Sequence, residues 1–168
     1  MAVARVVTGG QSGVDRAALD VAIAAGVPYG GFVPRDGWAE DLPHPPGVLS
    51  AYPRLTPTAS DDPLVRTVAN VVVADATLVV TSSSRPSRGT TATTRAAEAR
   101  GRPLLIVEPD AQGVDDGLAD WLMMLPAACA LNVAGPRESE WPGAYRTARS
   151  YLEARAGLLF GAADAAVR

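Results

Sequence analysis

Short apolar runs alternate along the chain with segments in which apolar residues recur every three or four positions. Runs at residues 5–8, 76–80, 104–107 and 130–133 are typical of strands, and a briefer run at 31–33 indicates another. Helical spacing begins at Val14, and Gly26 and Pro28 end it. This alternation of helices with largely apolar strands predicts an α/β fold, a doubly wound parallel sheet of about five strands with helices on both faces.

Four more helices are predicted, at residues 64–74, 89–99, 117–125 and 142–159, the last being the longest. Asp61 or Asp62 is expected to cap the first of these, and Asp115 or Asp116 the third. The segment from Pro34 to Pro63 contains seven prolines and little periodicity, so we expect a long loop that is functional or mobile. One domain is expected over residues 1–160, with a frayed tail at 161–168.

The composition narrows the class of protein. The chain has 168 residues, of which 48% are apolar, so it is long enough for one domain with a sizeable core. A net charge of −3 and a pI near 5.1 argue against nucleic-acid binding, which needs a positive face. The sequence shows neither a membrane span nor a signal peptide, so a cytoplasmic protein is expected.

All 15 basic residues are arginines, which excludes a Walker A loop and any lysine chemistry. Arginine binds phosphate and carboxylate through two parallel hydrogen bonds, so any bound anion would meet this side chain. The single cysteine, Cys129, and the single histidine, His44, cannot form a disulfide, a closed zinc site or a credible Ser-His-Asp triad. We therefore assign no catalytic residue and expect no structural metal.

Three polar segments follow predicted strands, where ligands bind in open parallel sheets. The first is glycine-rich and precedes a helix, a pattern typical of an anion-binding cradle, although its spacing is not GxGxxG. The alternative is a tight turn with Ser12 as the helix cap. The candidate residues are Gly9, Gly10, Gln11, Ser12, Gly13, Asp15 and Arg16.

The second segment, residues 81–91, could bind phosphate through hydroxyl and N–H groups, with Arg85 or Arg88 as a clamp. The alternative is a polar connecting loop. Because the strands before the first and second segments are plausible neighbours, we expect both segments to contribute to one anion site. The candidate residues are Thr81, Ser82, Ser83, Arg88, Gly89, Thr90 and Thr91.

The third segment, residues 131–139, offers Arg137 for an anion and Asn132 for the edge of a base or pterin, with Glu138 beside them. The alternative is a surface turn with an Arg-Glu pair. In the long loop, Glu40 and Asp41 could contact a ring or a metal, or form a solvated acidic pair. For Trp38, Trp121 and Trp141, packing is expected rather than stacking on a ligand.

The sequence resembles the family of molybdenum cofactor carrier proteins. The resemblance spans residue 8 to about residue 152 and is strongest in its first and last motifs. The matching segments are GGQSGVDRAALD at 9–20, AED at 39–41, Arg66-Thr67 with Asn70, DATL at 75–78, GTT at 89–91, RPLL at 102–105 and LNVAGPRES at 131–139, followed by Pro142-Gly143 and Tyr145. Gly37-Trp38 stand where that family usually has arginines, and Leu42 replaces a glycine.

This resemblance implies a Rossmann-like fold related to the lysine-decarboxylase-like proteins, which include cytokinin phosphoribohydrolases. It implies binding, protection and transfer of molybdenum cofactor, an anionic pterin with a phosphate tail. It also implies a homo-oligomer, a dimer or tetramer, with molybdoenzymes as transfer partners. The alternatives are a phosphoribohydrolase-like enzyme and a nucleotide or phosphate sensor. Against the enzyme, the hydrolase glutamate falls at Thr93, and Glu98 lies too far along the helix to replace it.

Overall fold

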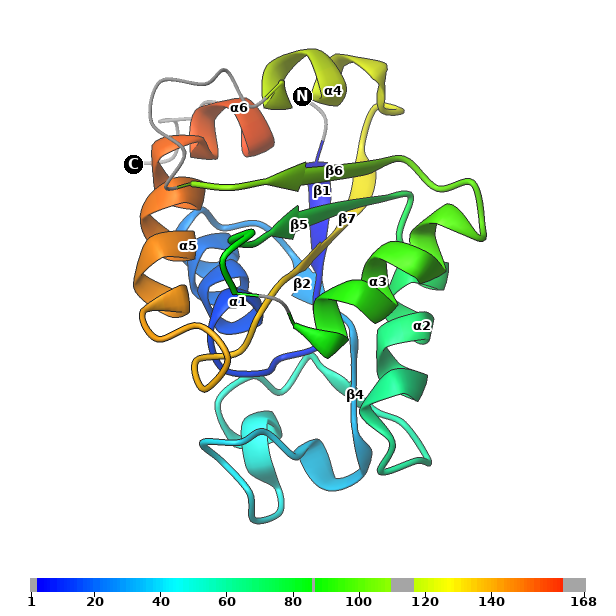
Figure 1. The fold of residues 1–168 in the computed structure, drawn as a ribbon, viewed down its shortest axis with the longest axis vertical. Helices are drawn as coiled ribbons and strands as arrows, with labels where there is room; N and C mark the ends of the chain where they lie inside the picture. Colours follow the sequence, from blue (N-terminus) through cyan, green and yellow to red (C-terminus); the bar gives the residue numbers. More distant parts are fainter. Residues whose placement is uncertain (1–2, 86, 110–116, 162–168) are drawn as a thin grey trace.

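The computed structural model describes residues 3–85, 87–109 and 117–161. A parallel five-stranded sheet forms its centre, in the order β2-β1-β7-β5-β6 (Figure 1). This confirms the predicted parallel α/β sheet. Its strands are β1 (Val3–Val7), β2 (Tyr29–Gly30), β5 (Ala76–Val80), β6 (Leu104–Val107) and β7 (Cys129–Ala134).

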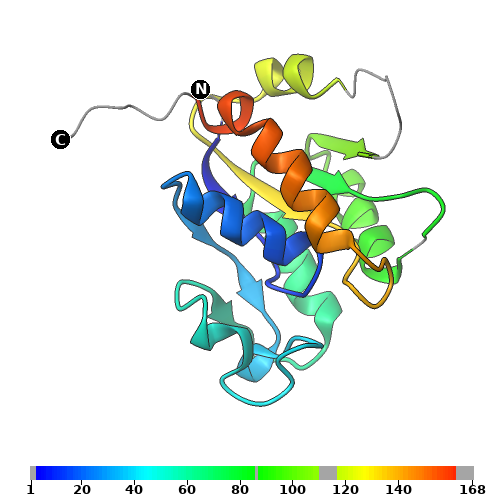
Figure 2. The ribbon, with the colours of Figure 1, turned by 90° about the vertical axis from the view of Figure 1, so that its left-hand side faces the viewer.

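Helices cover both faces of the sheet, as the alternating pattern predicts. Figures 1 and 2 show α1 and α5 packed together on one face and α2 and α3 on the other. The helices are α1 (Val14–Ala24), α2 (Pro63–Val73), α3 (Arg88–Glu98), α4 (Leu118–Met124), α5 (Ala144–Ala154) and α6 (Ala156–Phe160). Within the described residues, no helix is long and apolar enough to cross a bilayer.

The main core lies between the sheet and the α1–α5 layer. It joins strand residues such as Leu78 and Leu131 to the buried faces of α1, α4, α5 and α6, and it includes Trp121 and Trp141. All five residues of β5 are buried, which explains its continuous apolar sequence.

Two expectations about the strands were wrong. The run at 31–33 is interrupted: β2 ends at Gly30, and β3 (Phe32–Val33) pairs instead with β4 (Thr56–Pro57) in a separate two-stranded sheet. The strands β1 and β5 are not neighbours, because β7 lies between them and pairs with both. The first and second polar segments are therefore separated at the sheet edge by the segment after β7.

The helix predictions need two corrections. The predicted helix at 142–159 is two helices, α5 and α6, because Arg155 leaves the helical conformation with φ −111° and ψ 7°. At 11 residues, α5 is no longer than α1, α2 or α3. Gly117 caps α4 with φ 69°, while Asp115 and Asp116 lie outside the described residues, as do 162–168 of the predicted tail. The expected cap of α2 is confirmed: Asp62 accepts a hydrogen bond from the N–H of Leu64.

The proline-rich segment 34–63 contains no α-helix before α2 begins at Pro63. It has two 3₁₀ turns, η1 (Arg35–Gly37) and η2 (Gly47–Ser50), followed by β4. Four of its side chains are buried against Val33 and against Leu19 of α1, which gives the segment an apolar cluster of its own: Ala39, Val48, Tyr52 and Leu55. This packing holds the segment beside the carboxyl end of β1.

Candidate functional site

The loop between β1 and α1 is buried, yet several of its backbone groups have no partner. Gly9, Gly10 and Gly13 are all buried. Within the described part of the chain, their amide N–H groups donate to no acceptor. Unpaired buried N–H groups are rare in folded proteins, and a Gly-rich loop before a helix is a common anion site. Gly10 has φ 68°, a conformation that lets successive N–H groups point the same way.

A buried ion pair lies directly against this loop. Nη1 of Arg66, in the first turns of α2, lies 3.2 Å from Oδ2 of Asp15 in α1. Burial raises the pKa of Asp15, and Arg66 opposes that rise. A Cβ at position 9 would overlap the guanidinium of Arg66, so any larger residue there would displace that guanidinium. Among the site candidates the sequence analysis omitted Arg66, although a lone arginine in an apolar helix was a usable signal.

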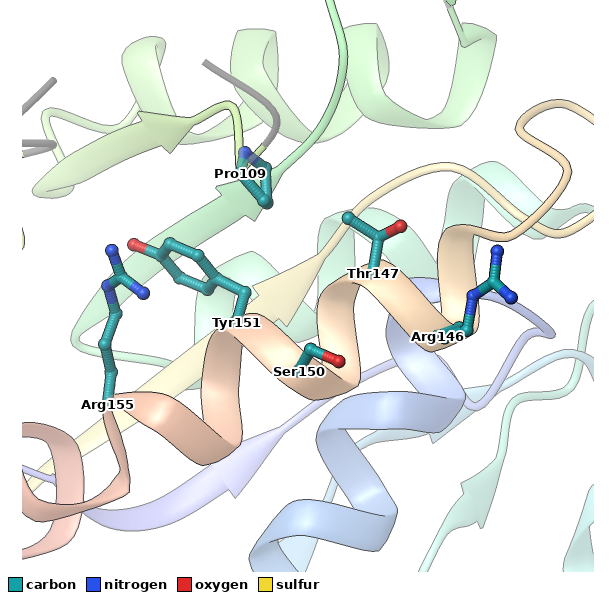
Figure 3. Close-up of a pocket in the computed structure, with 6 residues that line it drawn as sticks. All are labelled: Pro109, Arg146, Thr147, Ser150, Tyr151 and Arg155. Carbon is teal, nitrogen blue, oxygen red and sulfur yellow. The ribbon is translucent and has the colours of Figure 1, made fainter. Parts of the chain in front are cut away.

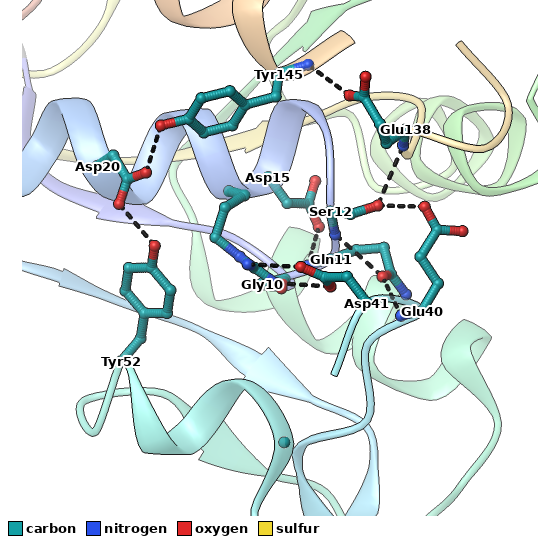
Figure 4. Close-up of polar contacts among 12 residues, drawn as sticks. Gly10, Gln11, Ser12, Asp15, Asp20, Glu40, Asp41, Tyr52, Glu138 and Tyr145 are labelled. Atoms are coloured by element: carbon teal, nitrogen blue, oxygen red, sulfur yellow. Dashed lines mark hydrogen bonds and ion pairs between the residues drawn. The ribbon is translucent and has the colours of Figure 1, made fainter. Parts of the chain in front are cut away.

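The proline-rich segment is tied to the first loop through Glu40. Its backbone N–H donates to Oε1 of Gln11 at 2.8 Å, and its carboxylate accepts a hydrogen bond from Oγ of Ser12 (Figure 4). Both the N–H and the hydroxyl of Ser139 donate to the same carboxylate, and Nε of Arg137 lies 3.4 Å from it. These three hydrogen-bond donors and the charge of Arg137 show that the edge of the site can hold an oxyanion.

The pKa of Glu40 reflects these contacts. Burial acts to raise it, but the hydrogen bonds from Ser12 and Ser139 and the charge of Arg137 outweigh burial and lower the pKa below its ordinary value of 4.5. Glu40 therefore stays ionised well into the acid range. The alternative considered from the sequence, a solvated acidic pair, is therefore wrong for Glu40, whose carboxylate is hydrogen-bonded to Ser12 and Ser139.

Arg16 and Asp20 fasten the same segment to α1. Arg16 donates two hydrogen bonds to the carboxylate of Asp41, at 3.0 and 3.1 Å. Asp20 accepts one hydrogen bond from the hydroxyl of Tyr52 and another from that of Tyr145, at 2.6 and 2.7 Å (Figure 4). The proline-rich segment, α1 and α5 are thus joined at one carboxylate.

The segment after β7 closes the other side of the loop. Gly13 has φ 76°, and a Cβ on it would overlap the backbone of Pro136 and Arg137. Arg137 pairs with Glu40 and Glu140, so the Arg137-Glu138 surface pair of the alternative interpretation is absent from the described residues. Glu138 instead accepts from the N–H groups of Gly143 and Tyr145 and so caps α5.

Asn132 does not join this group. It lies within β7, is 2% exposed, and its Nδ2 is 3.4 Å from Oγ1 of Thr77 in β5. Because the side chain of Asn132 is buried beside β5, it is not accessible to the edge of a ring. Sequence spacing could not show which way this side chain points.

The second polar segment meets the third, not the first. Ser87 caps α3 by accepting from the N–H of Thr90, and its hydroxyl donates to Glu140 at 2.8 Å. Of the sequence candidates here, Ser83, Arg88, Gly89 and Thr91 are exposed, and Thr81 and Ser82 are half-buried. Thr93 is buried and donates to the carbonyl of Gly89, so the hydrolase glutamate has no acidic counterpart at this position.

Buried polar atoms without a hydrogen-bond partner gather around these loops. Within the described residues they are Oγ1 of Thr8, Nε of Arg16, Nε of Arg66, Oγ1 of Thr90 and Nε of Arg137. Each belongs to the end of a strand, the first turns of a helix or a loop beside them. Such atoms cost stability unless a ligand or solvent satisfies them, which is typical of a binding site.

A separate cavity of about 400 Å³ lies along α5 beside the end of β6 (Figure 3). It shares no residue with the contacts described above. Its lining residues are Pro109, Arg146, Thr147, Ser150, Tyr151 and Arg155. Among the described residues, no group of three or more His, Cys, Asp or Glu side chains is placed to hold a metal ion.

Comparison with known proteins gives two matches. The family described as "Circularly permutated YpsA SLOG family" matches residues 6–156. The crystal structure of a "Putative molybdenum carrier protein" from Syntrophus aciditrophicus SB superimposes with a TM-score of 0.80 and 31% identity, covering 95% of this chain and 96% of that one. No curated protein matches the chain significantly. Together the matches confirm the family resemblance and the Rossmann-like fold.

Proposed function

The chain belongs to the circularly permutated YpsA SLOG family, and from this premise we propose that it binds and carries molybdenum cofactor. The similarity to a protein named as a molybdenum carrier supports this cargo. The protein would protect the cofactor, an anionic pterin that ends in a phosphate, and transfer it without a chemical step of its own. The acceptors would be molybdoenzymes in the cytoplasm, and the carrier a homo-oligomer.

The observation that carries the proposal is the set of buried glycine amides in the first loop. Gly9 and Gly10 present N–H groups that no described acceptor satisfies. The guanidinium of Arg66 lies against Gly9, and its Nε also lacks a hydrogen bond. Backbone N–H groups at a helix start bind phosphate and similar oxyanions, and a guanidinium adds a planar charged donor. We place the anionic end of the cargo there.

The donors around Glu40 would hold the second side of the cargo. The carboxylate of Glu40 already lies among donors from Ser12, Ser139 and Arg137. These donors come from two different loops, so an oxyanion on the cargo that replaced Glu40 would meet a preformed set of donors. Arg137 is 39% exposed and can turn toward such a group without leaving a buried charge behind.

The test is loading of the purified protein with molybdenum cofactor released from a molybdoenzyme. Bound molybdenum is measured by mass spectrometry after gel filtration, and the pterin by fluorescence after oxidation. Arg137→Ala should weaken binding by roughly ten-fold to a hundred-fold, because a charge-assisted contact contributes about 1.5–3 kcal/mol. Arg137→Lys should recover only part of the affinity, since an ammonium cannot make the planar two-point contact.

Arg95→Ala is the matched control, because Arg95 is exposed in the last turn of α3. It should load like the unchanged protein. If the unchanged protein takes up neither molybdenum nor pterin, the carrier proposal is wrong. If Arg137→Ala loads normally, the placement of the cargo beside Arg137 is wrong.

A further inference from the structure

The proline-rich segment encloses a pocket of about 390 Å³ that lies outside the contacts described above. This volume is in the range of small-molecule sites. Its walls combine four proline rings and one indole with three charged side chains. The lining residues are Pro34, Arg35, Asp36, Trp38, Pro43, Pro45, Asp61 and Pro63.

Trp38 differs from the other two tryptophans of the chain. Trp121 and Trp141 are each 7% exposed and belong to the main core. Trp38 is half-buried, belongs to none of the hydrophobic clusters of the described residues and lines the pocket together with four prolines. An indole that is not used in the core and lines a cavity is well suited to stack on a flat ring. The surrounding prolines have fixed φ angles, so the pocket is largely preformed.

The polar groups of the pocket favour one kind of ring. Arg35 is paired with Asp61 at 3.4 Å and also donates to the carbonyl of Ala59. Asp36 is exposed, its backbone has φ 61°, and its carboxylate has no hydrogen bond or ion pair within the described residues. A carboxylate accepts two parallel N–H bonds. A 2-amino-4-oxopyrimidine ring presents two such donors on one edge, its ring N–H and its amino group.

Two residues that line the pocket lie close along the chain to residues of the anion site. Trp38 is two residues before Glu40, which contacts Ser12 in the first loop. Pro63 is three residues before Arg66 on α2, and residues at this spacing lie on one side of a helix. One ligand could therefore place its ring beside Trp38 and its anionic group beside Arg66.

We propose that Trp38 and Asp36 form a subsite for a 2-amino-4-oxopyrimidine ring, with the indole stacking on the ring and the carboxylate accepting from its N–H edge. This ring occurs both in pterins and in guanine nucleotides. The subsite rests on the proposed carrier function, because that function places an anionic group of the same ligand at the neighbouring loop. It adds a specificity that the anion site alone lacks.

Calorimetric titration tests the subsite with three probes: 6-hydroxymethylpterin, GMP and AMP. AMP shares the phosphate and ribose of GMP but lacks the 2-amino-4-oxo edge, so it should bind about ten-fold more weakly. Trp38→Ala should weaken pterin and GMP binding by about five-fold to 150-fold, the usual contribution of one aromatic stack. Asp36→Asn, which keeps the side-chain size and tolerates positive φ, should remove the preference for GMP over AMP. Met123→Ala, which removes an 84% exposed apolar side chain, is the control and should bind all three probes normally.

The pterin and GMP arms distinguish the two sources of the ring, because only GMP carries a phosphate. Arg66→Lys, which keeps a positive charge beside Asp15 but loses the planar two-point donor, should weaken GMP binding and leave 6-hydroxymethylpterin unaffected. Binding of both probes that persists unchanged in Trp38→Ala and Asp36→Asn overturns the subsite, even if molybdenum cofactor still loads. No binding of either probe to the unchanged protein also overturns it. Binding that depends on Trp38 without any cofactor loading supports the subsite and contradicts the carrier function instead.

Discussion

The carboxylates of Asp15 and Glu40 lie beside the same loop, yet their pKa values shift in opposite directions. Burial dominates at Asp15 and raises its pKa, despite the neighbouring Arg66. At Glu40, hydrogen bonds outweigh burial and lower it. By linkage, the free energy of unfolding falls as the pH rises from the unfolded to the folded pKa of Asp15, because only the folded state keeps the proton in that interval. For Glu40 the free energy of unfolding falls in the other direction, as the pH drops from the unfolded to the folded pKa. The two carboxylates therefore contribute to the pH dependence of stability with opposite signs.

Replacing Glu40 with glutamine should make the acid sensitivity of folding smaller. At pH 7 the ionised carboxylate accepts from Ser12 and Ser139, and Glu40→Gln should lower the free energy of unfolding by about 1.5 kcal/mol. Below the folded pKa of Glu40 the native carboxyl is protonated, so the two proteins should converge. Urea unfolding at pH 7 and in the acid range measures both values. Glu98→Gln replaces an exposed carboxylate and is the control. If Glu40→Gln loses the same free energy of unfolding at both pH values, the direction of the pKa shift of Glu40 is contradicted.

Substitution of Gly9 tests whether the buried pair is held by the loop. A Cβ on residue 9 overlaps Nη1 of Arg66 and crowds Oδ2 of Asp15. Gly9→Ala should therefore separate the pair and cost about 3 kcal/mol, the usual loss when a buried ion pair is broken. Thermal unfolding gives the change. Gly157→Ala is the control: its added Cβ meets nothing within 4 Å, and because it lies in α6 it should leave stability unchanged or raise it. If Gly9→Ala is no less stable than Gly157→Ala, Arg66 moves aside and the loop does not hold the pair.

Single residues of the site were predictable where local sequence sets their role, and not where distant elements do. Gly9, Gly10 and Gly13 stand out in the sequence because three glycines in five residues exceed the needs of a turn. Ser139 does not stand out, and the role of Arg66 could not be assigned, since their partners are 99 and 51 residues away in the chain. The enclosed position of Asn132 depends on β5 packing beside β7, which no local pattern encodes.

Among the elements, the apolar periodicity predicted strand and helix identity better than arrangement. Four of the five sheet strands and the two helix layers follow from buried runs and helical spacing, whereas β2 was missed. The insertion of β7 between β1 and β5 depends on pairing between residues more than 50 positions apart, so the sequence could not reveal it. The proline-rich segment lacks periodicity because its buried residues pack one at a time against α1.

The start of α5 offers a test of an element that depends on one side chain. Glu138 accepts from the N–H groups of Gly143 and Tyr145, two donors that the helix itself cannot satisfy. Glu138→Ala should cost about 1 kcal/mol and speed amide hydrogen exchange at Tyr145. Glu153→Ala breaks only the exposed pair with Arg149 in the same helix, and it should leave exchange at Tyr145 unchanged. Unaltered exchange in Glu138→Ala would contradict the capping role.

For the whole molecule, charge does little to guide an anion toward the proposed site. Arg16, Arg66 and Arg137 are each paired with an acidic side chain, and the chain as a whole carries −3. Recognition then depends on short-range donors, the glycine amides and the guanidinium edges, not on a positive field. This distinguishes the site from the basic clefts that attract polyanions over long distances.

The sign of the salt effect on association follows from this balance. Because an anionic ligand such as GMP is weakly repelled by a negative protein, screening by added salt should leave its association rate unchanged or raise it, by no more than about two-fold between 20 and 200 mM NaCl. Stopped-flow measurement of ligand binding through tryptophan fluorescence gives the rate. The neutral 6-hydroxymethylpterin should show no dependence, which controls for effects of salt on the protein itself. A several-fold fall in the GMP association rate would mean that a positive field steers the ligand, and the site would then have to lie nearer the exposed Arg85 and Arg88 of the second loop than the glycine amides of the first.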